Sequence, residues 1–129
     1  MREIPATLIT ETVADLCVRA NQSLPPDVED ALRRAHQQEP WAPAKSNLSF
    51  MLRNLQAANS ARLPVCQDTG MACVFIDIGQ QVHIAGDDLE EAINRGVRLA
   101  YTEGYLRKSV VADPIRRGNT GDNTPALVT

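Results

Sequence analysis

Residues 63–79, LPVCQDTGMACVFIDIG, contain the point at which a helical pattern gives way to a strand-like one. Pro64 ends the helical segment, and the apolar run at 71–79, rich in β-branched residues, ends at Gly79. We therefore predict a mostly buried strand at 71–79 and a mixed α/β (α+β) chain. Three side chains from which a packed core gains little lie between the two elements: Cys66, Gln67 and Asp68.

Three amphipathic helices are predicted before this point. Apolar residues recur at helical spacing from Ile4 to Ala20, which predicts the first helix. Pro26, followed by acidic residues, marks the start of the second. A third apolar stripe runs from Leu48 to about Arg62. Together these segments predict an N-terminal helical bundle of about three helices.

A small sheet and a further helix are predicted after the strand. Residues 80–86, QQVHIAG, fit a second short strand or a hairpin return. Asp87 and Glu90 resemble a capping box at the start of a fourth helix that reaches to about residue 107. The remainder is irregular and ends on an apolar run, so we expect residues 1–129 to be a truncated, N-terminal part of a larger domain.

Composition excludes several classes of partner. Thirteen basic against sixteen acidic residues give a formal charge of −3, which offers no broad basic surface for a nucleic acid. No apolar run is long enough for a membrane span, and the N-terminus lacks the pattern of a signal peptide. We therefore expect a cytoplasmic protein with neither nucleic acid nor membrane as a partner.

The three cysteines differ in their surroundings. Cys17 lies on the apolar stripe of the first helix, which predicts simple burial. Cys73 lies within the predicted strand, and its spacing from Cys66 matches neither zinc-finger nor ferredoxin patterns. Cys66 lies in a turn that could present a thiolate to a cleft. Equally, Asp68 and Thr69 could bond the local backbone while Cys66 packs beneath the turn.

Two later segments could bind an anion. Arg107 and Lys108 follow the fourth helix, where the helix dipole alone favours cations, but an arginine can also hold a carboxylate through paired hydrogen bonds. The stretch NTGDNTPA, residues 119–126, concentrates backbone donors and short polar side chains. It could equally be a series of Asx turns without a ligand.

These motifs carry a family resemblance. LPVCQDTGMACVF together with GYLRKSVVADPIRRGNTGDNTPA resembles the alpha subunit, or the N-terminal region, of the class I iron-sulfur hydro-lyases. This family comprises oxygen-sensitive fumarate hydratases and L(+)-tartrate dehydratases, and the similarity covers nearly all of residues 1–129. The resemblance implies a [4Fe-4S] cluster held by three cysteines, with one iron open to substrate.

The resemblance also implies roles for individual residues. Cys66 matches the first cluster ligand; the other two are expected downstream of this chain, because Cys17 and Cys73 lie where the pattern has none. Arg107 matches an arginine that binds a substrate carboxylate. The remaining matches are Gln67 and Asp68, which contact substrate, and Asn119, Thr120 and Gly121, which line the site. Asp68 is in addition the candidate catalytic residue, for proton transfer near the hydroxyl.

The leading hypothesis is therefore the cluster-side part of a fumarate hydratase that interconverts fumarate and malate. The resemblance further implies a beta subunit or C-terminal domain as partner, a small dicarboxylate substrate, a homo-oligomer of the complete enzyme, and an inactive fragment. L(+)-tartrate, or another 2-hydroxy dicarboxylate, is the alternative substrate. Two other classes stay open: a non-enzymatic module that binds a small acid or a protein, and a redox thiol protein using Cys66 and Cys73.

Overall fold

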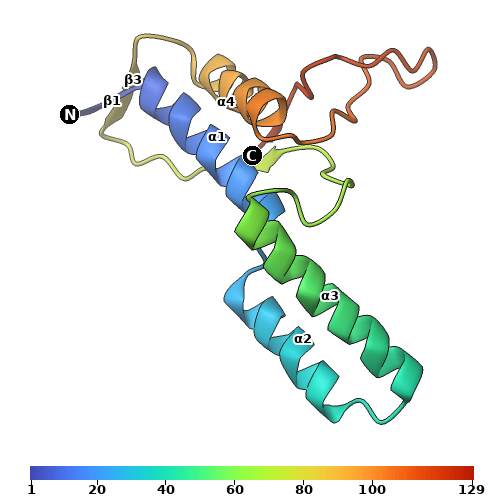
Figure 1. The fold of residues 1–129 in the computed structure, drawn as a ribbon. Helices are drawn as coiled ribbons and strands as arrows, with labels where there is room; N and C mark the ends of the chain where they lie inside the picture. Colours follow the sequence, from blue (N-terminus) through green and yellow to red (C-terminus); the bar gives the residue numbers. More distant parts are fainter. The chain divides into compact units, whose positions relative to one another are not determined.

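The computed structural model describes residues 1–129, which divide into two compact units. One unit comprises Met1–Arg19 and Gln67–Thr129, and the other comprises Ala20–Cys66. Helices and short parallel strands both occur, so the predicted mixed α/β class is confirmed (Figure 1). None of the helices is both long enough and apolar enough to cross a membrane.

The unit Ala20–Cys66 is a helical hairpin of α2 (Pro26–Gln38) and α3 (Ala42–Ala61), which lie side by side (Figure 1). Pro26 occupies the first turn of α2, where its missing N–H leaves no internal hydrogen bond unmade. α3 ends as predicted, because Arg62 adopts a left-handed conformation with φ of 53° and Pro64 follows. Leu55 and Ala58 of the predicted stripe are buried, whereas Met51 is exposed.

The other unit is built around α1 (Ala6–Gln22), in its part up to Arg19, and α4 (Leu89–Glu103). The two helices approach closely at Gly96, where an added Cβ would lie 2.6 Å from the carbonyl oxygen of Thr10. Thr10 also donates its hydroxyl to the carbonyl of Ala92, at 2.9 Å. The buried core of this unit contains Val13, Ala14, Ala72, Ile93, Val97, Ala100, Tyr101, Leu106 and Ala126.

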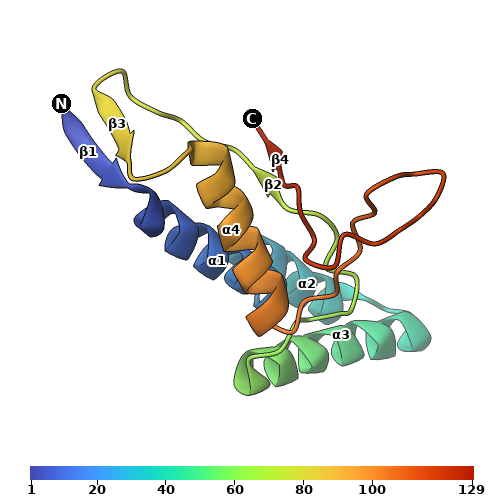
Figure 2. The ribbon, with the colours of Figure 1, turned by 90° about the horizontal axis from the view of Figure 1, so that it is seen from above.

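Two parallel pairs of strands complete this unit (Figure 2). β1 (Arg2–Pro5) pairs with β3 (Val82–Ala85), and β2 (Cys73–Val74) pairs with β4 (Leu127–Val128). Residues 80–86 therefore contain the predicted second strand, which pairs with β1 and forms no hairpin with β2.

Four details of the prediction were wrong. The fourth helix was expected to reach about residue 107, but α4 ends at Glu103, with Gly104 as its C-cap. The strand expected over 71–79 is reduced to β2, and Phe75 beside it is 79% exposed. Ile4 belongs to β1, and the first helix starts at Ala6. The cap of α4 is Asp88, whose carboxylate accepts from the amides of Glu90 and Glu91. Asp87 instead forms an ion pair with Arg95, which lowers the pKa of Asp87.

Candidate functional site

Three irregular segments of one unit are tied together by hydrogen bonds. They are the turn at residues 67–70, the chain that follows α4 at 105–111, and the loop at 119–126. Most of these bonds come from side chains. The backbone contributes the isolated bridge between Val111 and Asn119 and the bond from the Thr120 amide to the Val110 carbonyl. These segments contain six of the seven residues that the resemblance assigns to the site; Cys66 precedes Gln67 in the chain.

Asn123 is the centre of this network and is fully buried. Its Oδ1 accepts the backbone N–H groups of Ser109, at 2.6 Å, and Val110, at 2.9 Å. Its Nδ2 donates to the carbonyl oxygen of Gly70 at 3.1 Å. Asn123 has a φ of 65°, a left-handed conformation that asparagine tolerates better than most residues. One side chain thus joins all three segments.

Thr69 and Tyr101 make a second connection. The buried hydroxyl of Thr69 donates to the carbonyl oxygen of Arg107 at 2.9 Å. Tyr101 of α4 is also buried, and its hydroxyl lies 2.8 Å from the carbonyl oxygen of Thr69. Burial is the main reason that the pKa of Tyr101 is raised, so the phenol stays protonated and donates this bond. The turn is thereby fixed to both α4 and the backbone of Arg107.

The predicted site residues of the loop bond to neighbouring backbone. Asn119 donates from Nδ2 to the carbonyl of Lys108 at 2.9 Å and accepts from the amide of Gly121 at 2.7 Å. The amide of Thr120 donates to the carbonyl of Val110 at 3.0 Å. These bonds order the loop, and the role of Asn119, Thr120 and Gly121 in substrate binding stays a prediction.

An ion pair holds the same loop to α4. Arg98 donates from Nε to Asp122 at 2.9 Å, and Asp122 also accepts from the hydroxyl and amide of Thr124 at 2.7 and 3.0 Å. These bonds, led by that from Arg98, hold the pKa of the Asp122 carboxyl well below its usual range. Asp122 is therefore ionised at neutral pH and serves the loop structure.

Three side chains that the resemblance assigns to the substrate lie outside this hydrogen-bond network. Gln67, Asp68 and Arg107 are all exposed, and no ion pair of the structure includes Arg107. Its guanidinium can therefore receive an anionic ligand without first losing a carboxylate partner. Buried side chains hold the backbone that carries these exposed polar groups, which fixes the groups in a defined geometry, as a binding site requires.

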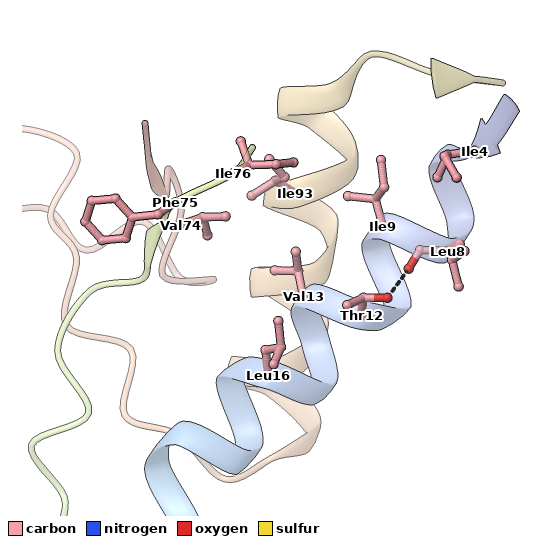
Figure 3. A pocket seen from close by; sticks show the side chains of 10 residues that line it. All are labelled: Ile4, Leu8, Ile9, Thr12, Val13, Leu16, Val74, Phe75, Ile76 and Ile93. Carbon is pink, nitrogen blue, oxygen red and sulfur yellow. Dashed lines mark hydrogen bonds between the residues drawn. The ribbon is translucent and has the colours of Figure 1, made fainter. Parts of the chain in front are cut away.

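An apolar pocket of about 300 Å³ lies elsewhere in the unit, between α1, the segment 74–76 and Ile93 of α4 (Figure 3). No charged side chain lines it. Its single hydroxyl, that of Thr12, donates to the carbonyl of Leu8 (Figure 3). Leu8 and Leu16, which belong to the apolar stripe noted between Ile4 and Ala20, line this pocket and are about half exposed. A dicarboxylate would lose its hydration there without compensation, so this pocket is unsuitable for it.

The protein family is evident from sequence comparison. Residues 10–129 match the family described as Fumarate hydratase (Fumerase). The chain belongs to the fumarate hydratase family. The family match includes the turn, Arg107 and the whole loop that the hydrogen-bond network brings together.

Relatives of this fumarate hydratase family member carry two different names. A protein of Methanocaldococcus jannaschii, provisionally described as L(+)-tartrate dehydratase subunit alpha, is 34% identical over 92% of the chain and 43% of its own length. Fumarate hydratase class I, anaerobic, of Escherichia coli is 38% identical over 79% of the chain and 20% of its own length. L(+)-tartrate dehydratase subunit alpha of Escherichia coli is 30% identical over 91% and 39%. The chain therefore spans less than half the length of these relatives.

The three cysteines of this chain do not come together as a complete cluster site. Cys66 and Cys73 are exposed, whereas Cys17 is half-buried against the core and burial raises its pKa. The placement of Cys17 confirms the prediction that it packs as an apolar residue. No group of three or more histidine, cysteine, aspartate or glutamate side chains is arranged to hold a metal ion. An exposed thiol in a turn suits one cluster ligand, and this chain alone supplies no set of three.

Sequence reasoning missed the residues that hold the site together. One of the two open interpretations of the turn has Thr69 bonding its local backbone, but its hydroxyl donates to the carbonyl oxygen of Arg107, 38 positions away. In the sequence, nothing separates Asn123 from the other polar residues of its loop. Nothing separates Tyr101 from the other positions of the fourth helix. The sequence holds no signal that singles out Asn123, because its need for several hydrogen-bonding partners arises only from its burial.

Proposed function

We propose that this chain is the cluster-side part of a hydro-lyase that interconverts fumarate and malate. The observation that carries the proposal is the family match over residues 10–129, which includes every candidate site residue. The exposed guanidinium of Arg107, whose backbone is bonded to the turn bearing Gln67 and Asp68, further supports it. Because the chain spans 20–43% of its relatives, the activity belongs to the complete enzyme and this part alone is inactive.

Arg107 binds one carboxylate of the substrate in this proposal. A guanidinium presents two parallel N–H donors to a carboxylate, which orients the acid as well as attracting it. Gln67 can donate a hydrogen bond from its amide, and Asp68 can exchange a proton near the departing hydroxyl. Holding the diacid at one end defines the faces from which the proton and the hydroxyl leave.

Cys66 is the residue of this chain that would ligate a [4Fe-4S] cluster. Its exposed thiol supports this role, and the further cysteine ligands would come from residues outside 1–129. When bound, such a cluster supplies a Lewis acid for a substrate hydroxyl. We also propose a beta subunit or C-terminal domain as partner, since two relatives are named as alpha subunits. A homo-oligomer of the complete enzyme and a cytoplasmic location complete the proposal.

L(+)-tartrate is the second candidate substrate. It has the same two carboxylates and a hydroxyl to lose, and the relatives that carry its name align with over nine-tenths of the chain. The residues described here serve either acid, since both present a carboxylate to Arg107. The choice between the two substrates therefore depends on measurement.

The experiment is to purify the full-length enzyme with its partner under anaerobic conditions and to measure two rates. Hydration of fumarate and dehydration of L(+)-tartrate are followed under the same conditions. We expect fumarate turnover to dominate. Turnover of tartrate alone would replace the substrate, and turnover of neither acid would overturn the hydro-lyase proposal.

A further inference from the structure

Four consecutive residues after α4 have their backbone groups held by side chains from elsewhere in the unit. The carbonyl of Arg107 accepts from Thr69, and the carbonyl of Lys108 accepts from Asn119. The amides of Ser109 and Val110 both donate to Asn123. This segment lies in no helix or strand, so side chains supply the bonds that a neighbouring strand would otherwise provide.

The same side chains also hold the opposite segment. Asn123 bonds the carbonyl of Gly70, and Tyr101 fixes the carbonyl of Thr69. The turn bearing Gln67 and Asp68 is therefore linked to the backbone of Arg107 through groups that are almost entirely buried. Because the side chains that make these bonds are buried, water competes less for them than for the exposed side chains they support, and the linkage is correspondingly stiffer.

We propose that Thr69 and Asn123 are positioning residues that fix Arg107 relative to Gln67 and Asp68. This inference rests on the proposed function, because it gives the hydrogen-bond network a role in binding the diacid. Neither positioning side chain contacts the ligand itself. A misplacement of about 1 Å at a reacting group can lower a rate about 100-fold, so positioning bonds of this kind affect turnover well beyond their effect on stability.

Thr69→Val tests the proposal in the full-length enzyme with its partner. Valine keeps the shape of threonine and removes the bond to Arg107. The matched control is Thr10→Val, which removes the 3.2 Å bond from Thr10 to the carbonyl of Ala6 and a bond of the same length as that of Thr69, 2.9 Å, to the carbonyl of Ala92. That bond joins α1 to α4 and involves none of the site residues.

We expect Thr69→Val to raise KM for the acid that the wild type turns over and to lower kcat/KM about 10- to 100-fold. Thr69→Ser, which restores the hydroxyl, should recover most of this loss. Thr10→Val should keep kcat and KM within about twofold of wild type, even where both valine variants lose similar stability. Should Thr69→Val fail to fold, Tyr101→Phe removes one bond to the same turn and should raise KM in the same direction.

Two results would count against the inference, and they are distinguishable. A folded Thr69→Val enzyme with wild-type KM and kcat overturns the positioning role and leaves the proposed function intact. A wild-type enzyme that turns over neither fumarate nor tartrate overturns the proposed function, and the positioning role with it.

Discussion

Asn123 and Gly70 lie 53 positions apart in the chain and are joined by a hydrogen bond of 3.1 Å from the side-chain amide to the carbonyl oxygen. This bond brings the turn that follows Cys66 together with the loop near the C-terminal end of the chain. Both segments are irregular, and both contain residues that the family resemblance assigns to substrate. Their association explains how separated motifs can form one site.

Asn123→Ala should be strongly destabilising. The substitution removes a fully buried side chain and leaves the part-buried amides of Ser109 and Val110 and the carbonyl of Gly70 without their partner. An unsatisfied buried group costs about 1–3 kcal/mol, so we expect a loss of about 2–4 kcal/mol in the free energy of unfolding. Urea denaturation followed by circular dichroism measures it.

Asn119→Ala is the matched control for this prediction. Asn119 makes two hydrogen bonds in the same loop, but its side chain is exposed and water can replace them. We expect its cost to stay below about 1 kcal/mol. Equal losses in the free energy of unfolding for the two variants would show that burial does not determine how much the Asn123 bonds contribute to stability.

Gly96→Ala should also be destabilising, although alanine favours helices by about 1 kcal/mol over glycine. The new Cβ would lie 2.6 Å from the carbonyl of Thr10 and 2.8 Å from the Cβ of Val13. Relief of such overpacking costs about 1–3 kcal/mol, so the clash exceeds the gain in propensity. Thermal unfolding should give a lower Tm than wild type.

Gly118→Ala provides the comparison, because a Cβ added at this residue would meet no atom within 4 Å and its φ is not in the left-handed range. We expect its free energy of unfolding to stay within about 1 kcal/mol of wild type. A Gly96→Ala variant as stable as Gly118→Ala would refute the close contact of α1 and α4.

The helices could be predicted because their signals are local. Pro26 at the start of α2 and the left-handed Arg62 after α3 act within a few residues, and the apolar stripes repeat along the same segment. The cap of α4 was placed one residue early, at Asp87, because Asp87 and Asp88 are chemically equivalent in the sequence. Only the three-dimensional geometry shows which carboxylate meets the free amides.

The pairing of the strands and the hydrogen-bond network of the site could not be predicted in the same way. β1 pairs with β3 across about 80 positions, with Arg2 opposite Val82, and nothing in residues 2–5 indicates that partner. Cys66 and Arg107 were noticed because their chemistry is distinctive and matches a family motif. The contribution of Asn123 depends on Gly70, which is remote in sequence, so its residue type alone did not distinguish it from neighbouring polar residues.

Asp122→Asn should cost stability in a pH-dependent manner. The pKa of Asp122 is lowered in the folded protein, chiefly by Arg98, so its charged form stabilises the fold above the unfolded pKa of about 3.9. The pair is partly exposed, and we expect a loss of about 1 kcal/mol at pH 7. The difference from wild type should shrink as the pH falls below about 5. Urea unfolding at pH 7 and pH 3 measures this difference.

Asp77→Asn is the control, because Asp77 is exposed and takes part in no ion pair. Its free energy of unfolding should differ little from wild type at either pH.

The three thiols should react at different rates with iodoacetamide. Burial raises the pKa of Cys17 and shields its sulfur, so less thiolate is present and access is restricted. Cys66 and Cys73 are exposed and should be alkylated about tenfold faster or more under native conditions. Peptide mass spectrometry at timed intervals measures the three rates, and equal rates in urea serve as the control. Rapid native labelling of Cys17 would contradict its place against the core.

Arg107→Lys should impair binding of the diacid while retaining the positive charge. Lysine presents one compact ammonium where arginine presents two parallel donors, so the carboxylate loses its fixed orientation. In the full-length enzyme we expect KM to rise about tenfold or more, corresponding to about 1.4 kcal/mol of lost binding.

Arg116→Lys is the control. It makes the same exchange at an exposed arginine of the 111–119 loop that takes part in no ion pair, and it should leave KM unchanged. Because both variants keep the same net charge, a rise in KM for Arg107→Lys alone reflects paired hydrogen bonds to the substrate. Equal KM values for the two variants would remove Arg107 from the substrate site.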